Sequence, residues 1–465
     1  MMENIDKNII KEFNATRKSH KFLCNAPFVS MNISPMGIVS PCCYNHTIIE
    51  DYSRKSITEI FKGKIYRQYR KAIRKGIFPI ACSMCRNSLL NREYTSLQIL
   101  DYDYFKASRI FPNKLRCASI SLSNVCNLEC VMCNGIYSSC IRKNREKQES
   151  LNLSYKHKFR DEIKSLLPEM QTITLIGGEP FLDPVYYEIC DDIISINPKC
   201  SICVTTNGTI LNDRIKQLLD KGNFYITVSF NGVTKNTYET IHVNANFEET
   251  QANLLYFGDY MKKNNKTLTI NICPLKLNKF EIPDVVRFCN QNNFLINIGK
   301  VRGAVDVALF SSTEENLIEV KEFYQDQKFE VTSNICHKNI LEFKDLIRRI
   351  DKWIELAKIK KDYLNLFDLN TDKIDSFEKK MFFEIENSLR TMYSNDDEVQ
   401  LKLKQIQKRW QDILMGLPSF FYSNHLYQRL SKLSPILFLE YFINGNYEWL
   451  CNFCNEIFYY GLDHN

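Results

Sequence analysis

Three cysteines lie close together in the chain, at Cys126, Cys130 and Cys133. Three thiolates at this spacing can bind three irons of a [4Fe-4S] cube. No fourth cysteine lies at a matching spacing, so the fourth iron would stay open to another ligand. The alternatives for this loop are a zinc knuckle and a set of reduced cysteines without a metal.

The pattern around this loop alternates between short apolar strands and helical stretches, from Leu115 to about Gly303. Such alternation indicates βα units on a parallel sheet. The predicted strands are 118–122, 172–176, 201–205, 224–230, 267–273 and 294–299. In barrels built from these units, chemistry takes place in the loops at the carboxyl ends of the strands, and the three-cysteine loop follows the first predicted strand.

Polar motifs also follow the next three predicted strands. The second strand runs into Gly177-Gly178-Glu179-Pro180. Glycines let a backbone approach a ligand closely, and a carboxylate can accept hydrogen bonds from an ammonium group. The third and fourth strands end in Thr205-Thr206-Asn207-Gly208 and Ser229-Phe230-Asn231-Gly232. An ordinary turn is the alternative for each motif, and Asn is common in turns for backbone reasons alone.

Together these motifs resemble those of the radical S-adenosylmethionine (SAM) enzymes, whose signature is Cys-x3-Cys-x2-Cys followed by Gly-Gly-Glu-Pro. The resemblance implies an α/β fold with a partial (βα)6 barrel. It assigns Cys126, Cys130 and Cys133 as catalytic residues and as ligands of a [4Fe-4S] cluster whose open iron binds SAM. Its candidate SAM contacts are Gly177, Gly178, Glu179, Pro180, Thr206, Asn207, Ser229 and Asn231. Relatives often have Asp where this chain has Asn231.

A second cysteine pattern precedes the predicted barrel. Cys24 and Cys42 flank a predicted hairpin with its turn at Ser34-Pro35-Met36-Gly37, and Cys82-x2-Cys85 follows a predicted helix from Ser56 to about Lys75. This pattern resembles the first half of the SPASM motif, known as a twitch domain. The resemblance implies a second, auxiliary [4Fe-4S] cluster held by Cys24, Cys42, Cys82 and Cys85. Cys43 could replace Cys42, and a structural zinc site is the alternative.

The resemblance implies reductive cleavage of SAM to a 5′-deoxyadenosyl radical, which abstracts hydrogen from a substrate. Twitch and SPASM proteins commonly modify peptides, so a peptide or protein maturase is the first hypothesis. The second is a radical enzyme acting on a carbohydrate or other small metabolite, and the third is a non-catalytic iron-sulfur or zinc scaffold. An enzyme would need an electron donor such as ferredoxin or flavodoxin.

Composition is that of a soluble globular protein, with 44% hydrophobic and 25% charged residues. The net charge of +7 is spread along the chain, and basic stretches such as 67–75 and 402–409 follow helical patterns, so we expect solvated faces and no nucleic-acid partner. No apolar run is long enough to span a bilayer. The first residues lack a signal-peptide pattern, so the 18 cysteines predict a reducing, cytoplasmic setting.

The chain is predicted to have four parts. Residues 1–20 form a lead-in, 21–113 the twitch-like α+β domain with its connector, 114–310 the radical SAM core and 311–465 a mostly helical C-terminal region. The last part ends with an aromatic-rich stretch and Cys451-x2-Cys454, for which incidental thiols are the favoured interpretation over a ligand pair.

Overall fold

The computed structural model describes residues 7–17, 22–35, 37–43, 50–52, 55–79, 82–90, 92, 94, 97–105, 114–299, 301, 304 and 306–364, with short stretches between 379 and 408. Cys451 and Cys454 lie outside the described residues. The chain divides into two compact units. Unit 1 holds residues 1–272, 284–298 and 329–342, and unit 2 holds residues 273–283, 299–328 and 343–465.

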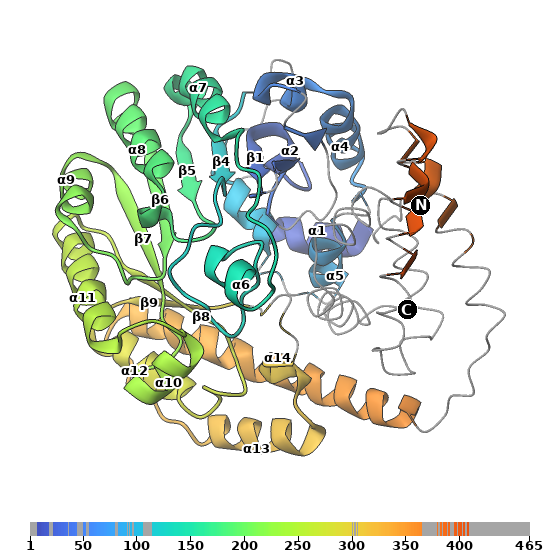
Figure 1. The fold of residues 1–465 in the computed structure, drawn as a ribbon. Helices are drawn as coiled ribbons and strands as arrows, with labels where there is room; N and C mark the ends of the chain where they lie inside the picture. The colour runs from blue at the N-terminus through green and yellow to red at the C-terminus, as the bar shows by residue number, and fades with distance from the viewer. Residues whose placement is uncertain are drawn as a thin grey trace. The chain divides into compact units, whose positions relative to one another are not determined.

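The core of unit 1 is one nine-stranded sheet in the order β3-β2-β1-β4-β5-β6-β7-β8-β9 (Figure 1). Strands β4 to β9 are parallel to their neighbours and follow one another in chain order. Their bounds are β4 Cys117–Ile120, β5 Thr172–Leu175, β6 Ser201–Thr206, β7 Phe224–Ser229, β8 Thr269–Ile272 and β9 Leu295–Ile298. The six predicted strands are therefore confirmed, and the open parallel sheet with its helices is consistent with a partial barrel.

Helices connect these strands and cover the sheet. They are α6 Ser139–Asn144, α7 Lys156–Leu166, α8 Pro184–Ile196, α9 Asp213–Lys221, α10 Lys235–Ile241, α11 Phe247–Lys263 and α12 Ile282–Gln291. Figure 1 shows α7, α8, α9 and α11 along the outer side of the sheet. Alternate strand residues such as Ile173, Ile202 and Ile226 are buried, so the strands are held by apolar packing while their carboxyl ends remain available for polar loops.

The N-terminal segment adds three strands to the same sheet rather than building a separate one. Strand β1 (Ser30–Ile33) pairs parallel with β4, and β2 (Ile38–Ser40) and β3 (Glu50–Asp51) extend it antiparallel. The predicted hairpin is confirmed, with Gly37 at φ +76 in its turn. The sheet is thus continuous across the boundary predicted between residues 113 and 114.

The helices of the N-terminal segment are α1 Lys7–Ala15, α2 Ala26–Val29, α3 Ile57–Lys62, α4 Lys64–Arg74, α5 Ser83–Leu90 and the 3-10 helix η2 Gln98–Tyr102. The single helix predicted from Ser56 to Lys75 is therefore wrong. It begins at the predicted capping box of Ser56 and Glu59, but Gly63 takes an extended backbone (φ −68, ψ 172) that separates α3 from α4. Gly76 then closes α4 with φ +73, which glycine adopts without strain.

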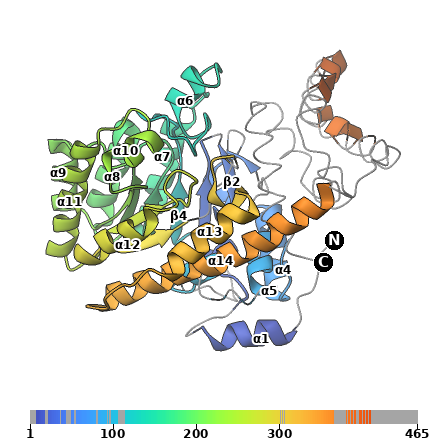
Figure 2. The same ribbon diagram turned by 90° about the horizontal axis from the view of Figure 1, so that it is seen from below.

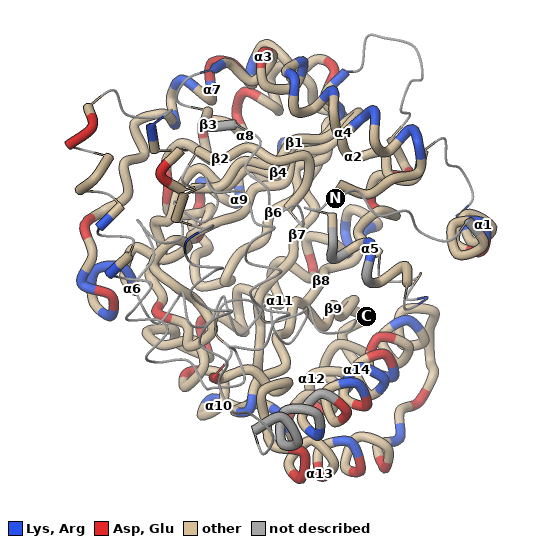
Figure 3. The backbone as a smooth tube through the Cα atoms, turned by 90° about the vertical axis from the view of Figure 1, so that its right-hand side faces the viewer, with Lys and Arg blue, Asp and Glu red and all other residues tan. Residues whose placement is uncertain are grey.

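The basic stretch 67–75 on α4 is only partly a solvated face, which corrects the prediction. Figure 3 shows Lys and Arg along α4. Arg70 is buried, however, and its guanidinium donates to the carbonyls of Pro27 and Phe61 at 2.7 and 2.8 Å. The Arg70 guanidinium therefore joins α2 to α3 and α4, and it is buried away from the surface.

Beyond residue 310, the described residues are mostly helical, as predicted. The elements are η5 Leu309–Ser311, α13 Glu314–Gln325 and the long α14 Asn334–Leu364, which begins in unit 1 and is drawn as one continuous helix in Figure 2. Aromatic contacts hold unit 2 together, with Tyr324 and Phe343 rings 5.0 Å apart. None of the described helices is long and apolar enough to cross a membrane.

Candidate active site at the carboxyl ends of the strands

The three-cysteine loop follows β4 and is held by backbone hydrogen bonds rather than by regular structure. The N–H groups of Glu129 and Val131 donate to the carbonyls of Val243 and Ile241, both at 3.0 Å. These bonds join the loop to the segment just after α10. The loop therefore has a defined path even though it contains no helix or strand.

The two glycines of the Gly-Gly-Glu-Pro turn allow the second loop to pack directly on the first. Both have positive φ, +87 at Gly177 and +51 at Gly178. A Cβ at Gly177 would overlap Ser121 Oγ, and one at Gly178 would overlap the carbonyl of Val125. These glycines therefore leave room for the loop that follows β4. Their predicted role, a close approach of the backbone to a ligand, stays a prediction.

Glu179 lies at the centre of this arrangement and is fully buried, with 0% of its surface exposed. Its Oε1 accepts hydrogen bonds from Phe181 N at 3.0 Å and Thr206 Oγ1 at 2.8 Å. Its Oε2 accepts one from Asn207 N at 2.7 Å, and its own N–H donates to Val125 O at 2.7 Å. The carboxyl group thus ties the turn after β5 to the end of β6, and the backbone N–H of Glu179 ties that turn to the cysteine loop.

Burial raises the pKa of the Glu179 carboxyl from an ordinary 4.5 to about 7, although hydrogen bonds from Asn207, Phe181 and Thr206 act in the opposite direction. Only the ionised form attracts an ammonium group. If Glu179 binds the SAM ammonium, affinity for SAM should increase about fourfold between pH 6 and pH 8, because ionisation of Glu179 is partly offset by deprotonation of the SAM amino group. Equilibrium dialysis on reconstituted protein measures the change. Affinity that does not change with pH would contradict this contact.

The same shift has the opposite effect on stability. The folded protein holds the Glu179 proton more tightly than the unfolded chain does, so its contribution to the free energy of unfolding should fall as the pH rises from about 4.5 to about 7. Glu179→Gln removes this titration and serves as the control for both measurements.

Thr206 and Asn207 stand at the end of β6 and contact the site from that side. Besides their bonds to Glu179, the Asn207 side-chain amide donates to Asn127 Oδ1 at 3.0 Å. Asn127 in turn donates to Thr209 Oγ1 at 2.9 Å. Asn127 and Thr209 were not predicted as site residues. Asn127 occupies a variable position of the Cys-x3-Cys-x2-Cys signature and Thr209 follows the Thr-Asn-Gly turn, so their positions near Cys126 and Asn207 were the available signal.

Ser229 and Asn231 follow β7. Ser229 is half-buried at the strand end, whereas Asn231 is buried and its Nδ2 lies 3.0 Å from Nε2 of His242. The other ring nitrogen of His242, Nδ1, lies 3.3 Å from Cys130 Sγ. His242 is 1% exposed, and burial lowers its pKa to about 4. This histidine was not predicted, since a lone His beyond the motifs carries no signal of its own.

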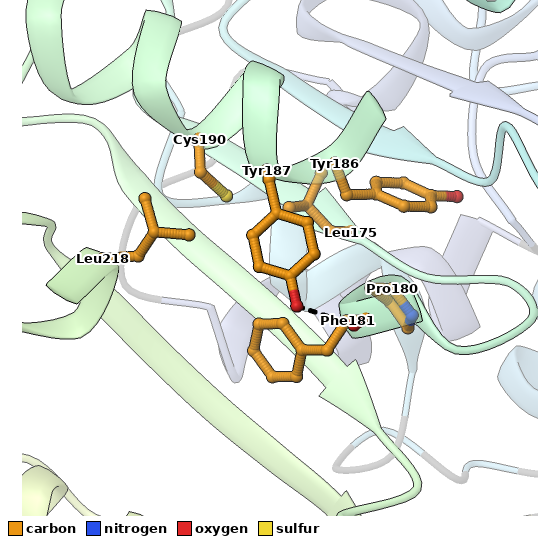
Figure 4. Close-up of a pocket in the computed structure, with 7 residues that line it drawn as sticks. All are labelled: Leu175, Pro180, Phe181, Tyr186, Tyr187, Cys190 and Leu218. Carbon is orange, nitrogen blue, oxygen red and sulfur yellow. Dashed lines mark hydrogen bonds between the residues drawn. The ribbon is translucent and has the colours of Figure 1, made fainter. Parts of the chain in front are cut away.

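Tyr186 on α8 joins the residues that follow β4 and β5. Its hydroxyl accepts from Leu122 N at 2.8 Å and donates to Ile176 O at 2.9 Å, and the ring is buried. Tyr187, the next residue, donates to Phe181 O at 2.7 Å across the apolar crevice drawn in Figure 4. Both tyrosines thereby support the turn that carries Glu179, and neither was predicted.

Replacing Tyr186 with Phe should lower the free energy of unfolding by about 1–3 kcal/mol, because it leaves the buried Leu122 N–H without this partner. Thermal unfolding measures the loss. Tyr187→Phe is the matched control and should cost less, about 1 kcal/mol, because Tyr187 is only half-buried. Equal losses in the two variants would contradict the bridging role of Tyr186.

The three thiols fit a [4Fe-4S] cluster in donor chemistry. Burial raises the pKa of Cys126 to about 11 and that of Cys133 to about 12, where the neighbouring Cys126 adds to the increase. In the described part of the chain, however, no three Cys, His, Asp or Glu side chains stand in a metal-binding arrangement. The fit therefore rests on the donor set and the loop that carries it.

The second cysteine set comes together in the N-terminal part of unit 1. Cys24, Cys42, Cys82 and Cys85 are all partly buried and pack against the same apolar cluster, which includes Phe13, Phe22 and Phe28. Burial raises the pKa of Cys42 well above its ordinary value, and the thiols of Cys43, Cys85, Cys82 and Cys24 raise it further. The four predicted ligands of the auxiliary cluster are thus neighbours, and Cys43 lies with them.

Comparison with known families agrees with this geometry. Residues 120–289 match the family described as the radical SAM superfamily, and residues 24–87 match an iron-sulfur cluster-binding domain, SPASM. The chain thus contains a radical SAM domain and a SPASM domain. Its radical SAM domain implies a [4Fe-4S] cluster and SAM, and its SPASM domain implies auxiliary iron-sulfur binding. The family resemblance, including the position of the auxiliary motif before the core, is confirmed.

Curated relatives of the radical SAM domain include two with the name "Probable GTP 3′,8-cyclase". One from Methanocaldococcus jannaschii is 26% identical over 204 residues, 40% of this chain and 59% of the relative. One from Methanothermobacter marburgensis is 30% identical over 182 residues, 38% of this chain and 55% of the relative. The matches thus span little more than half the length of these relatives.

Two solved structures also align with the chain. Native anSMEcpe with bound AdoMet is 15% identical over 45% of this chain and 60% of its own, with a TM-score of 0.35. Streptococcus suis SuiB bound to S-adenosylmethionine is 15% identical over 58% of each chain, with a TM-score of 0.36. At these scores neither structure supports an inference about this protein.

Proposed function

We propose that this protein reductively cleaves SAM and uses the resulting radical to abstract hydrogen from a peptide or protein substrate. The observation that supports SAM chemistry is the buried Glu179 carboxyl, held between the cysteine loop and the end of β6. The same turn packs on the loop that carries Cys126, Cys130 and Cys133. A carboxylate beside three thiols matches the pattern of ligands that a cluster and a SAM ammonium require.

When bound, the reduced cluster and SAM supply a 5′-deoxyadenosyl radical. The chain's own residues bind and orient them. A carboxylate offers about four acceptor sites, of which Glu179 uses three for Phe181, Thr206 and Asn207. The remaining acceptor site is on Oε2, and in this proposal it accepts from the SAM ammonium. In this proposal Thr206 and Asn207 position the carboxylate, Ser229 and Asn231 are further SAM contacts, and a reduced ferredoxin or flavodoxin supplies the electron.

The substrate class has two candidates. The SPASM match supports a peptide or protein, because radical SAM proteins of the twitch and SPASM types commonly modify peptides. The curated relatives named GTP 3′,8-cyclase favour a small molecule such as a nucleotide as the second candidate. The alternative to both enzyme candidates is a non-catalytic iron-sulfur or zinc scaffold, and it predicts that Glu179 is dispensable.

Anaerobic reconstitution tests the chemistry. We expect about eight irons per chain, in two cubes, and conversion of SAM to 5′-deoxyadenosine once the protein is reduced with dithionite. Stoichiometric zinc, or iron without SAM cleavage, would overturn the proposal in favour of the scaffold.

Deuterium transfer distinguishes the two substrate classes. Short peptides encoded beside this gene, prepared with deuterated side chains, should pass deuterium into 5′-deoxyadenosine if the maturase proposal holds. Deuterated GTP serves as the parallel probe. Transfer from GTP and from none of the peptides would replace the first candidate with the second.

A further inference from the structure

His242 connects a predicted cluster ligand to a residue beyond the loop. It follows α10 and lies between Cys130 and Asn231, with Nδ1 at 3.3 Å from Cys130 Sγ and Nε2 at 3.0 Å from Asn231 Nδ2. All three side chains belong to unit 1. The two contacts use the two ring nitrogens, so each nitrogen has an assigned neighbour.

The hydrogen bond from Asn231 determines which ring nitrogen carries the proton. The Nδ2 of an asparagine amide is a donor only, so Nε2 of His242 must accept and therefore carries no hydrogen. A neutral imidazole has one N–H, which is then on Nδ1. That N–H faces Cys130 Sγ. The arrangement thus presents a hydrogen-bond donor to the sulfur.

The ring is held in this orientation from several sides. Tyr238 stacks on it, with ring centroids 4.5 Å apart and an interplanar angle of 29°. The backbone N–H of His242 donates to Tyr238 O at 2.8 Å, and the bonds from Glu129 and Val131 join the cysteine loop to residues 243 and 241. Because both partners of the contact are fixed by backbone bonds, Nδ1 and Cys130 Sγ meet without help from a ligand.

We propose that His242 is a positioning residue that donates its Nδ1–H to the sulfur of Cys130 and raises the reduction potential of the cluster bound there. Hydrogen bonds to ligating sulfurs favour the more negative, reduced cluster. Asn231 then acts through His242 by fixing its tautomer. This inference rests on the proposed binding of a [4Fe-4S] cluster by Cys126, Cys130 and Cys133.

Two substitutions at one position test the inference. His242→Phe keeps a ring against Tyr238 but has no donor, whereas His242→Asn places an amide N–H near the former Nδ1. The midpoint potential of the SAM-binding cluster is measured by redox titration monitored by electron paramagnetic resonance. All variants keep the auxiliary cluster, so its contribution to the signal is the same in each. We expect His242→Phe to favour the oxidised cluster about tenfold, equivalent to about 59 mV for one electron. His242→Asn should stay close to the original protein.

The outcomes separate this inference from the proposed function. If the original protein binds no cluster at Cys126, Cys130 and Cys133, the proposed function fails. If it binds one and His242→Phe leaves the potential unchanged, or if Asn and Phe lower it equally, His242 is only packing and the inference is overturned.

A measurement on the unsubstituted, metal-free protein does not depend on iron binding. Nitrogen-15 NMR of histidine-labelled protein distinguishes the two imidazole tautomers, and His242 is assigned by comparison with His242→Asn. We expect the Nδ1–H tautomer. An Nε2–H tautomer at His242 would overturn the inference.

Discussion

Replacing Cys126, Cys130 and Cys133 together with Ala should abolish SAM cleavage and reduce the iron content from about eight to about four per chain. The three thiols are the only donors that the Cys-x3-Cys-x2-Cys signature supplies to the radical SAM cluster. The remaining iron should stay with the N-terminal cysteines, which lie on the hairpin side of the sheet and around α5. Iron analysis and assay of 5′-deoxyadenosine measure both effects.

Cys203→Ser is a suitable control for this experiment. Cys203 is a half-buried thiol on β6 that belongs to neither cysteine set, so its variant should keep about eight irons. SAM cleavage that persists in the triple variant would refute the assignment of the three ligands. Loss of all iron would instead show that the two sites do not form independently.

Glu179→Gln should weaken SAM binding about ten- to a hundredfold and lower the rate of 5′-deoxyadenosine formation. The substitution keeps the size of the side chain but removes the charge, and a hydrogen bond to a charged group contributes about 1.5–3 kcal/mol. Equilibrium dialysis of SAM against the reconstituted variant measures the affinity. Thermal unfolding is measured in parallel, because the amide of the variant has one acceptor oxygen where the carboxylate has two. It therefore cannot keep all three hydrogen bonds from Phe181, Thr206 and Asn207.

Glu188→Gln is the matched control for the Glu179 experiment. Glu188 is on α8 in a partly exposed ion pair with Arg160, at 2.9 Å, so the same chemical change should alter stability by less than about 1 kcal/mol. SAM affinity should not change in this control. A folded Glu179→Gln protein with unchanged SAM affinity would show that the carboxylate does not contact the ammonium.

The sequence by itself determined the parallel core and the order of its motifs. Each predicted core strand agrees with β4 to β9 within two residues at either end. These strands are short runs rich in Ile, Val and Thr between turn residues, a local signal that neighbouring residues carry without help from the rest of the fold. Because parallel strands share one carboxyl edge, the positions of the three cysteines, Glu179 and Thr206 at strand ends also followed from sequence.

The helix break at Gly63 is a local feature that the periodicity of the apolar residues did not predict. The apolar positions on the two sides of Gly63 fit one helical period, so the sequence predicted one helix. Gly63 takes the extended backbone that separates α3 from α4, and a Cβ at that position would lie 3.0 Å from the carbonyl oxygens of Glu59 and Ile60. Whether such a glycine continues or ends a helix is decided by packing around it.

Only the tertiary structure decided which side chains support the site. Tyr186 bonds backbone groups 64 and 10 residues away, and His242 lies 112 residues from Cys130. No local periodicity or spacing encodes such contacts, because they depend on how loops from different strands pack at the common edge of the sheet. The chemical roles of the cysteine loop and Glu179 were therefore predicted from sequence. The burial of Glu179, the packing of Gly177 against Ser121 and the orientation of His242 arise only from the folded arrangement.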